Sequence, residues 1–352
     1  MVQKMDTFDL VPLAGSTRMT DVAKAAGVSL VTVSRAINHP DKVSSKTLIA
    51  VQQAIQQLGY VPNLMAGSLA SNRSFIIAAM VPTISNLIFA ESIGTLSETL
   101  IAAGYQLLLG QTNYNGNDEH RLVDAFLGRR VDGLVLMGKI QDTQPHDSES
   151  GKLNSLTERL LRARLPVVQM WDLVSTPVDM QVGFSNLEAG RKAGTYLADS
   201  GRRIVGFIGA DESRSHARLK GLKAAIEERG GKVVASLMPA PAGIETSDAQ
   251  LSKLLQQASN LQAVFCNNDL LATGVLFACR KRGIDVPHQM AVMGLGDMPI
   301  AEAACPRLTT LRVEPRRMGE IAANLLMDRL SGKQMASMSY DIGIEIIRRD
   351  SA

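Results

Sequence analysis

The sequence predicts an α/β protein with two parallel-sheet subdomains, preceded by a small all-helical domain. Three observations predict it. From residue 75 onward, apolar runs such as FIIAAMV (75–81) alternate with amphipathic segments of helix length, the pattern of buried parallel strands with helices on both faces. About 275 residues follow this pattern, more than one sheet usually holds, so two subdomains with a cleft between them are expected. Residues 18–60 instead show helical periodicity broken by glycines.

The first helix of the small domain is predicted over residues 21–26 and ends at Gly27, because glycine commonly closes a helix. Thr17 and Thr20 are alternative caps for its start.

Two further helices follow, and each has a serine as its predicted N-cap. The second begins after Ser29 and runs to about Asn38, and the third begins after Ser44 and ends at Gly59. The buried stripe of the third helix is predicted to be Val51, Ile55 and Leu58.

The remaining chain alternates between strands and helices. After the strand at 75–81, apolar residues at helical spacing from Phe89 to Leu100 predict a helix that ends at Gly104. The other helix-length segments, such as HRLVDAFLGR (120–129), join further apolar runs. These runs predict strands at YQLLLG (105–110), DGLVLMG (132–138), PVVQMW (166–171), RIVGFIG (203–209), AVFCN (263–267) and MAVMGLG (290–296).

Ligands of parallel sheets bind beyond the carboxyl ends of the strands. The segments at these ends are therefore expected around a common opening: TISN (83–86), Gly138–Lys139, Trp171–Asp172, Ala210–Asp211, Asn267–Asp269 and Gly296–Asp297.

Charge is concentrated in the helical domain. Residues 18–73 contain six basic and two acidic side chains, a net +4, whereas residues 74–352 balance at 30 basic against 30 acidic. This excess fits a polyanionic partner. The three cysteines lack metal-binding spacing and are interpreted as free thiols in a reducing compartment. No signal peptide and no membrane span is predicted, so the expected location is cytoplasmic.

The first two helices, joined by AAGVS, are typical of a helix-turn-helix. Val22, Ala23, Val33 and Ile37 are predicted to pack inward, so the second helix shows Leu30, Val31, Ser34 and Arg35 outward. A helix fits the major groove of DNA, and its N-terminal amides and Ser29 can meet phosphate. The spacing of these helices by itself is also compatible with a small three-helix domain that binds no ligand.

The chain resembles the lac/gal repressor family from DVAKAAGVSLVTVSRAIN through VSSKT to LGYVPNLMAGSLAS. Further resemblance lies in VFCNNDLLATG, VPHQMAVMGLGD and PRLTTLRVE, so it extends over nearly everything after residue 17. The segments VPTISNLIFAE and VGFSNLEAGR are most similar to the gluconate-operon repressor branch.

The resemblance implies that Leu30 and Val31 read bases and that Arg35 adds a base or phosphate contact. Being apolar, the two readers suit thymine methyl groups. It also implies a hinge helix after Pro62, in which Leu69 wedges into the minor groove of bent DNA; a plain linker is the alternative. The implied DNA-contacting residues are Ser29, Leu30, Val31, Thr32, Ser34, Arg35, Asn38, Asn63 and Leu69.

The resemblance also implies that the α/β part has the fold of a periplasmic sugar-binding protein and senses a small molecule. Arg218 matches an effector-holding arginine; otherwise it is a solvated helix residue. Asn268 matches a ligand-facing asparagine, whereas Asp269 is interpreted as the cap of the next helix. Asp172 matches an acidic residue that contacts the effector, and its alternative is a structural role in a loop or helix cap. Trp171 is expected either to stack on the face of a sugar or to pack in the core.

The stretch GLGD departs from sugar-binding relatives, because Gly296 stands where they often carry an aspartate and Asp297 comes one residue late. Fewer carboxylates favour an anionic effector, and Lys139 adds a cation. Ser85 is a candidate partner for hydroxyl groups. The expected effector is therefore a sugar acid: gluconate first, then a ketogluconate or phosphogluconate. His216 either touches this ligand or lies on the surface.

The resulting organisation is a disordered tail, a helix-turn-helix domain, a hinge and an effector-binding and dimerisation domain. The boundaries are 1–17, 18–61, 62–74 and 75–352, with one subdomain at about 75–183 and 312–337 and the other at about 184–311 and 338–352.

The expected function is a cytoplasmic homodimeric repressor that binds double-stranded operator DNA and is released by its effector; on the operator it would be nucleoid-associated. The alternatives are a co-repressor-type regulator responding to another metabolite and a non-regulatory sugar-binding protein. No enzyme motif is found, and no cofactor, metal or membrane partner is predicted. A periplasmic receptor would need a signal peptide and no helix-turn-helix. No leucine heptad follows residue 330, so a tetramer-forming tail is not expected.

Overall fold

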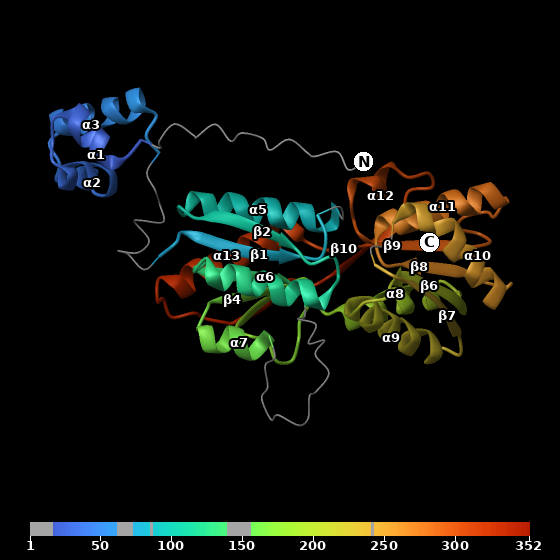
Figure 1. Cartoon of the computed structure of the whole chain (residues 1–352). Coiled ribbons are helices and arrows are strands. Elements are labelled where there is room, and N and C mark those ends of the chain that lie inside the picture. The colour runs from blue at the N-terminus through green and yellow to red at the C-terminus, as the bar shows by residue number, and fades with distance from the viewer. Residues whose placement is uncertain (1–16, 62–72, 85–86, 139–155, 241–242) are drawn as a thin grey trace, which may run out of the picture. The chain divides into compact units, whose positions relative to one another are not determined.

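The computed structural model of the chain (Figure 1) describes residues 17–61, 73–84, 87–138, 156–240 and 243–352. Contacts between residues divide the chain into two compact units, residues 1–72 and residues 73–352.

The first unit is helical. Its elements are α1 (Met19–Ala26), α2 (Leu30–Asn38), a 3₁₀ turn η1 (Pro40–Lys42) and α3 (Ser45–Leu58). Its small core consists of Val22, Ala23, Val33, Ala36, Val51, Ala54 and Tyr60.

The predicted serine caps are confirmed: Ser29 and Ser44 begin α2 and α3 by accepting hydrogen bonds from backbone amides three residues on. Neither threonine caps α1. Instead Arg18 occupies the cap position and its backbone N–H donates to Oδ2 of Asp21 at 2.8 Å. The prediction that Leu58 belongs to the buried stripe is wrong, because this side chain is 37 % exposed at the last turn of α3.

The first sheet of the second unit has six parallel strands in the order β11–β5–β4–β3–β1–β2. The strands are β1 (Ile76–Val81), β2 (Gln106–Gln111), β3 (Gly133–Met137), β4 (Val167–Met170), β5 (Met180–Gly183) and β11 (Ser339–Asp341).

The second sheet has the order β12–β10–β9–β8–β6–β7 and is parallel except for the antiparallel pair β10–β12. Its strands are β6 (Ile204–Ala210), β7 (Lys232–Met238), β8 (Ala263–Cys266), β9 (Ala291–Gly296), β10 (Thr309–Arg312) and β12 (Glu345–Ile347). The predicted α/β class with two parallel-dominated sheets is thus confirmed.

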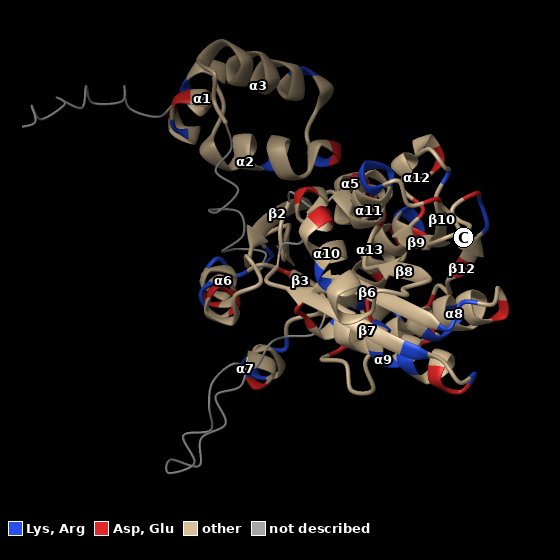
Figure 2. Ribbon diagram, turned by 90° about the vertical axis from the view of Figure 1, so that its right-hand side faces the viewer, with Lys and Arg blue, Asp and Glu red and all other residues tan. Residues whose placement is uncertain are grey.

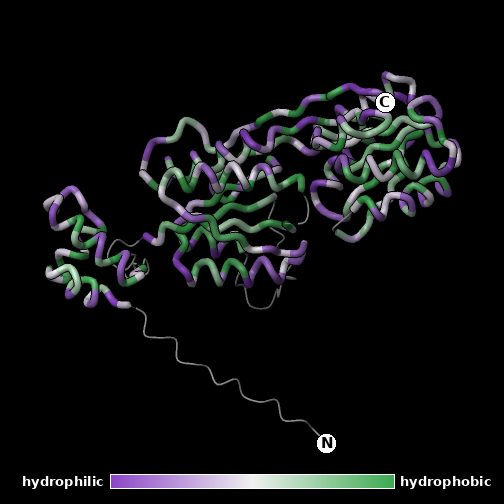
Figure 3. Tube along the Cα trace, turned by 90° about the horizontal axis from the view of Figure 1, so that it is seen from above, coloured by the Kyte–Doolittle hydropathy of each residue, from purple (hydrophilic) through white to green (hydrophobic). Residues whose placement is uncertain are grey.

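Helices cover both faces of each sheet (Figure 1). Around the first sheet lie η2 (Leu87–Phe89), α5 (Ala90–Ala102), α6 (Gly116–Gly128), α7 (Leu156–Ala163) and α13 (Pro315–Leu330). Around the second lie α8 (Asn186–Asp199), α9 (Ser213–Glu227), η3 (Ile244–Thr246), α10 (Ser247–Gln257), α11 (Asp269–Arg282) and α12 (Pro299–Ala303). Hydrophobic residues concentrate along the strands (Figure 3), because both faces of such sheets are buried.

The chain passes between the two sheets after β5, after β10 and between β11 and β12. The third passage lies later in the chain than predicted. The sequence places residues 338–352 in the second subdomain, whereas Ser339–Asp341 pair with β5 of the first sheet. A strand of three residues has too little periodicity to reveal its sheet. The passages bring the carboxyl ends of strands from both sheets to one pocket.

Candidate ligand pocket and nucleic-acid interface

The turn between α1 and α2 is made by backbone geometry. Gly27 closes α1 with a φ of 66°, a left-handed conformation that glycine adopts without steric cost. The hydroxyl of Ser29 then accepts a hydrogen bond from the Thr32 amide at 3.1 Å and lies 2.8 Å from the Thr32 hydroxyl. These contacts start α2 at Leu30 and direct its first turn outward.

The first turn of α2 presents apolar side chains to the exterior. Leu30 is 46 % exposed and Val31 65 % exposed, while Val33 and Ala36 are buried on the opposite face. Apart from Arg35, α2 is uncharged (Figure 2). Large apolar groups exposed on a short helix suit a partner that removes them from water, such as the methyl-bearing floor of the major groove.

The structure places the other predicted DNA-contacting residues as follows. Arg35 and Asn38 are exposed, and Thr32 and Ser34 are half-buried. The Asn38 amide donates to the Ser34 carbonyl at 3.0 Å. Asn63 and Leu69, and with them the predicted hinge helix, lie outside the described residues.

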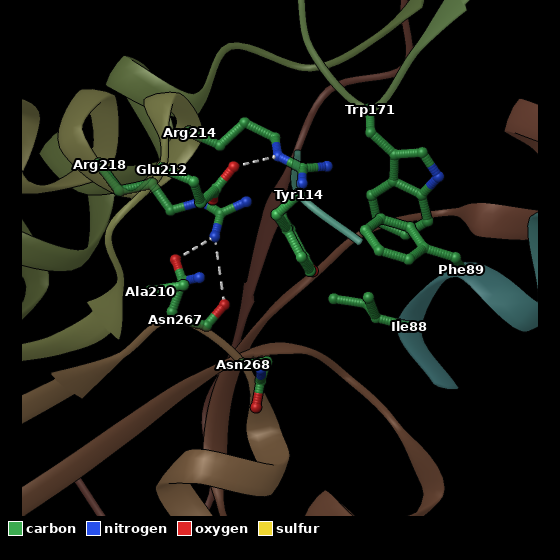
Figure 4. A pocket seen from close by; sticks show the side chains of 10 residues that line it. All are labelled: Ile88, Phe89, Tyr114, Trp171, Ala210, Glu212, Arg214, Arg218, Asn267 and Asn268. Atoms are coloured by element: carbon green, nitrogen blue, oxygen red, sulfur yellow. Dashed lines mark hydrogen bonds and ion pairs between the residues drawn. The ribbon is translucent and has the colours of Figure 1, made fainter. Parts of the chain in front are cut away.

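A pocket lies where strands of both sheets end, and it contains about 450 Å³ of space including its open mouth. Figure 4 shows the guanidinium groups on one side and aromatic rings on the other. The lining residues are Ile88, Phe89, Tyr114, Trp171, Ala210, Glu212, Arg214, Arg218, Asn267 and Asn268.

Arg218 projects from α9 into this pocket and is only 5 % exposed. Its Nε donates to Oδ1 of Asn186 at 2.8 Å, and its Nη1 donates to the carbonyl of Asn267 at 3.2 Å and to the side-chain oxygen of that residue. Burial lowers the pKa of Arg218 to about 10, so the guanidinium remains charged at neutral pH. Arg218 is therefore a pocket residue and not a solvated one.

Asn186, at the start of α8, links Arg218 to the end of β4. Its Nδ2 donates to the Trp171 carbonyl at 3.2 Å and to Oδ1 of Asp172 at 2.8 Å. Asp172 does not line the pocket itself. Burial raises the pKa of its carboxyl group, although the hydrogen bond from Asn186 and the charges of Arg214 and Arg218 oppose this.

Arg214 lies one helical turn before Arg218 and forms a buried ion pair, with its Nε 2.9 Å from Oε2 of Glu212. Burial alone would lower the pKa of Arg214 and raise that of Glu212, but the attraction between the opposite charges outweighs burial, so both pKa values shift toward the charged forms. Both groups are thus ionised. The guanidinium also lies over the ring of Phe89, 5.3 Å from its centroid, a favourable cation–π geometry.

Trp171 forms the aromatic side with Phe89, whose ring packs edge-on against it at a centroid distance of 5.2 Å. The indole is 1 % exposed and its Nε1 donates to the Ser92 hydroxyl at 3.2 Å. Trp171 therefore packs in the core and also lines the pocket, and its stacking on a sugar stays a prediction.

The α11 start differs from the prediction. Asn268, not Asp269, caps this helix, with its Oδ1 accepting from the Leu271 amide at 2.9 Å. Asp269 is fully buried and accepts hydrogen bonds from the Met298 amide and the Thr310 hydroxyl. The sequence could not distinguish them, because either side chain can cap a helix and only long-range contacts occupy Asp269.

Two other residues are turned away from the pocket. Asp297 forms ion pairs with Arg312 and Arg349, each at 2.7 Å, so it joins β9 to β10 and to the chain end. His216 is exposed and lies 2.6 Å from Asp211, as in the surface interpretation.

Of the predicted effector residues, the pocket lining contains Arg218 and Asn268, and Asp172 reaches it only through Asn186. Ser85 and Lys139 lie outside the described residues. Sequence reasoning missed Asn186, Arg214, Glu212 and Tyr114. The spacing of Arg214 and Arg218 was the available signal, because residues four apart share one face of a helix.

Within the described residues, no group of three or more His, Cys, Asp or Glu side chains is arranged to hold a metal ion. No described helix is long and apolar enough to cross a bilayer.

Comparisons with known proteins match a part of each of the two units. Residues 18–63 match the bacterial regulatory proteins of the lacI family, and residues 195–352 match the periplasmic binding protein-like domain. The HTH-type transcriptional regulator GntR of Pseudomonas aeruginosa is 33 % identical over 341 residues, covering 96 % of each chain.

Two solved structures are also similar. A GntR transcription regulator from Chromobacterium violaceum is 31 % identical with a TM-score of 0.71 and covers 78 % of this chain and 98 % of its own. A LacI-family regulator from Silicibacter pomeroyi is 26 % identical with a TM-score of 0.85 and covers 95 % of this chain and 99 % of its own.

Proposed function

Because the chain belongs to the lacI family of DNA-binding transcriptional regulators, we propose that it represses genes for the use of a sugar acid and is released from its operator when that acid binds. Gluconate or a ketogluconate is the proposed effector. The matches described above confirm the predicted family. The identity of the effector and its release of the protein from DNA are what we propose.

The observation that carries the proposal is the pair of buried guanidinium groups of Arg214 and Arg218 in one pocket. A guanidinium binds a carboxylate through paired hydrogen bonds, and each carries N–H groups beyond those already described. A neutral sugar would leave their excess charge uncompensated in a buried site, which is costly.

The other lining groups suit the rest of a sugar acid. The amides of Asn267 and Asn268 offer donors and acceptors for hydroxyl groups. The rings of Trp171 and Phe89 offer an apolar face for the carbon chain. The similarity to regulators named GntR, and the resemblance of 81–91 and 182–191 to the gluconate-operon repressor branch, support the same ligand class.

The proposed mechanism is linkage between the pocket and the DNA-binding unit. The pocket is lined from both sheets, so a ligand that contacts both favours one angle between them. We propose that this angle controls how residues 62–74 of two protomers meet on the operator. A symmetric homodimer is proposed because operator half-sites mirror the symmetry of the protein.

The proposal is tested by fluorescence anisotropy with the DNA upstream of the gene and a scrambled duplex of equal length. We expect preference for the upstream DNA and loss of it when gluconate or 2-ketogluconate is added, with no effect of glucose. Tighter DNA binding with the ligand would instead favour a co-repressor. The absence of any preferred duplex would exclude an operator-binding function.

A further inference from the structure

Glu212 is the one carboxylate among the described residues that line the pocket. It comes from the turn before α9, and two of its contacts are local: Oε1 accepts hydrogen bonds from the amide and the hydroxyl of Ser215, both at 3.1 Å. Its other oxygen pairs with Arg214. A helix cap needs an acceptor oxygen but no charge, so capping leaves the charge of Glu212 unexplained.

The charge of Glu212 matters because the three charged side chains of the lining are nearly buried. The side chains of Glu212 and Arg214 are 9 % and 8 % exposed, and Arg218 is 5 % exposed as a residue. Charges in such a site are weakly screened, so an imbalance of one unit affects ligand affinity strongly. The lining carries two positive charges and one negative, a net +1.

Two further carboxylates lie nearby but outside the lining. Asp172 is separated from the pocket by Asn186, and its pKa is raised by burial. Glu119 borders the neighbouring hollow that lies beside Arg214. Glu212 is therefore the acidic group whose charge a bound ligand meets most directly.

We propose that Glu212 determines the charge of the effector: by neutralising one of the two guanidinium groups, it makes the pocket select monoanions over dianions and over neutral polyols. This inference rests on the proposed function, and it separates unphosphorylated monocarboxylic sugar acids from phosphorylated and dicarboxylic ones. With a monoanion the lining and ligand sum to zero, whereas a dianion leaves a net negative charge facing Glu212.

The test uses three open-chain ligands of equal carbon number and increasing charge: sorbitol, gluconate and glucarate. Dissociation constants are measured by titration calorimetry at pH 7.5 on the full-length protein. The variants are Glu212→Gln, Arg214→Gln and the double variant. The matched control is Glu228→Gln, which removes an exposed carboxylate paired with Arg191 after the end of α9.

We expect the wild type and Glu228→Gln to prefer gluconate. Glu212→Gln raises the affinity for glucarate relative to gluconate by about tenfold or more, the order expected for one charge in a partly buried site. Gln keeps an acceptor oxygen for the cap of α9. Arg214→Gln shifts the preference toward sorbitol, and the double variant, whose lining again carries +1, returns it to gluconate.

The two proposals fail in different ways. If the wild type binds none of the three ligands and does not bind 2-ketogluconate either, the proposed sugar-acid function is wrong and this inference falls with it. If the wild type binds gluconate but the folded variants keep the wild-type order of the three ligands, only the inference is overturned. A merely structural role of Glu212 would lower all three affinities together. If one single variant does not fold, the other still tests the expected shift.

Discussion

Asn186 and Arg218 join the two halves of the candidate pocket: Oδ1 of Asn186 accepts from Nε of Arg218 at 2.8 Å, across 32 residues of sequence. The same amide donates to the carbonyl of Trp171 and to Asp172 at the end of β4. Asn186 is 1 % exposed. The position of the pocket arginine therefore depends on an amide that links α9 to the end of β4.

Asn186→Ala is expected to lower the affinity for gluconate by at least tenfold and the free energy of unfolding by about 1–3 kcal/mol, because it leaves a buried guanidinium N–H and a carboxylate with fewer partners. Calorimetry and urea unfolding measure the two effects. Asn117→Ala, at the exposed start of α6, serves as the control. Full affinity in the Asn186 variant would show that the bridge does not position Arg218.

Gly190 sets the distance between α8 and α9. A Cβ at this position would lie 1.9 Å from the carbonyl oxygen of Arg218, whereas a Cβ on Gly94 of α5 meets nothing within 4 Å. Gly190→Ala is therefore expected to lower the free energy of unfolding by about 3 kcal/mol. Gly94→Ala should raise it by up to about 1 kcal/mol, because alanine is the better helix former. Equal effects of both changes in urea unfolding would contradict the close approach.

Leu30 and Val31 are expected to contribute to operator recognition and not to folding. Changing either to alanine should weaken binding to the preferred duplex by about tenfold, the order of one lost base contact, with the affinity for scrambled DNA and the melting temperature unchanged. Ile49→Ala, which truncates a 54 % exposed residue of α3, is the matched control. If Ile49 proved as important as Leu30, α2 would not be the reading helix.

Asp269 is expected to make stability depend on pH. Burial raises the pKa of its carboxyl group from 3.8 to about 6, with the charge of Asp297 acting in the same direction. Between these values the folded protein binds a proton that the unfolded chain does not, so this group's contribution to stability grows as pH falls from about 6 toward 4 and is lost as pH rises.

The measurement compares urea unfolding of the wild type and Asp269→Asn at several pH values. Relative to the variant, the wild type should gain about 1.4 kcal/mol for each pH unit of decrease within this window. The other carboxylates contribute equally to the pH dependence of both proteins, so their contributions cancel in the difference between the two free energies of unfolding. A difference independent of pH would mean that Asp269 titrates normally in the folded protein.

Helix ends and buried strands could be predicted from short segments of the sequence. The caps at Ser29 and Ser44 and the glycine ends of α1 and α3 depend on neighbours a few residues away. The seven predicted apolar runs all form strands. Six of these strands are buried over nearly their whole length and must therefore be apolar throughout, whereas β2 is a partly exposed edge strand.

The elements that the sequence did not reveal are short or lie near sheet edges. β5 has four residues, and β11 and β12 have three each, too few for a periodic pattern. The edge strand β7 alternates between buried and partly exposed residues and lacks a continuous apolar run. Such strands form because a neighbouring strand is already in place, which is a long-range contact.

The pocket likewise combines residues that the sequence predicted with contacts that it did not. Arg218 and Asn268 were predicted as its residues, but the pairing of Arg214 with Glu212, the bridge through Asn186 and the removal of Asp269 into the core were decided by the tertiary structure. Patterns along the chain report which side chains can carry charge or cap a helix. Only packing decides which charges are buried together, because the energy of a charge depends on the partners and the solvent around it in space.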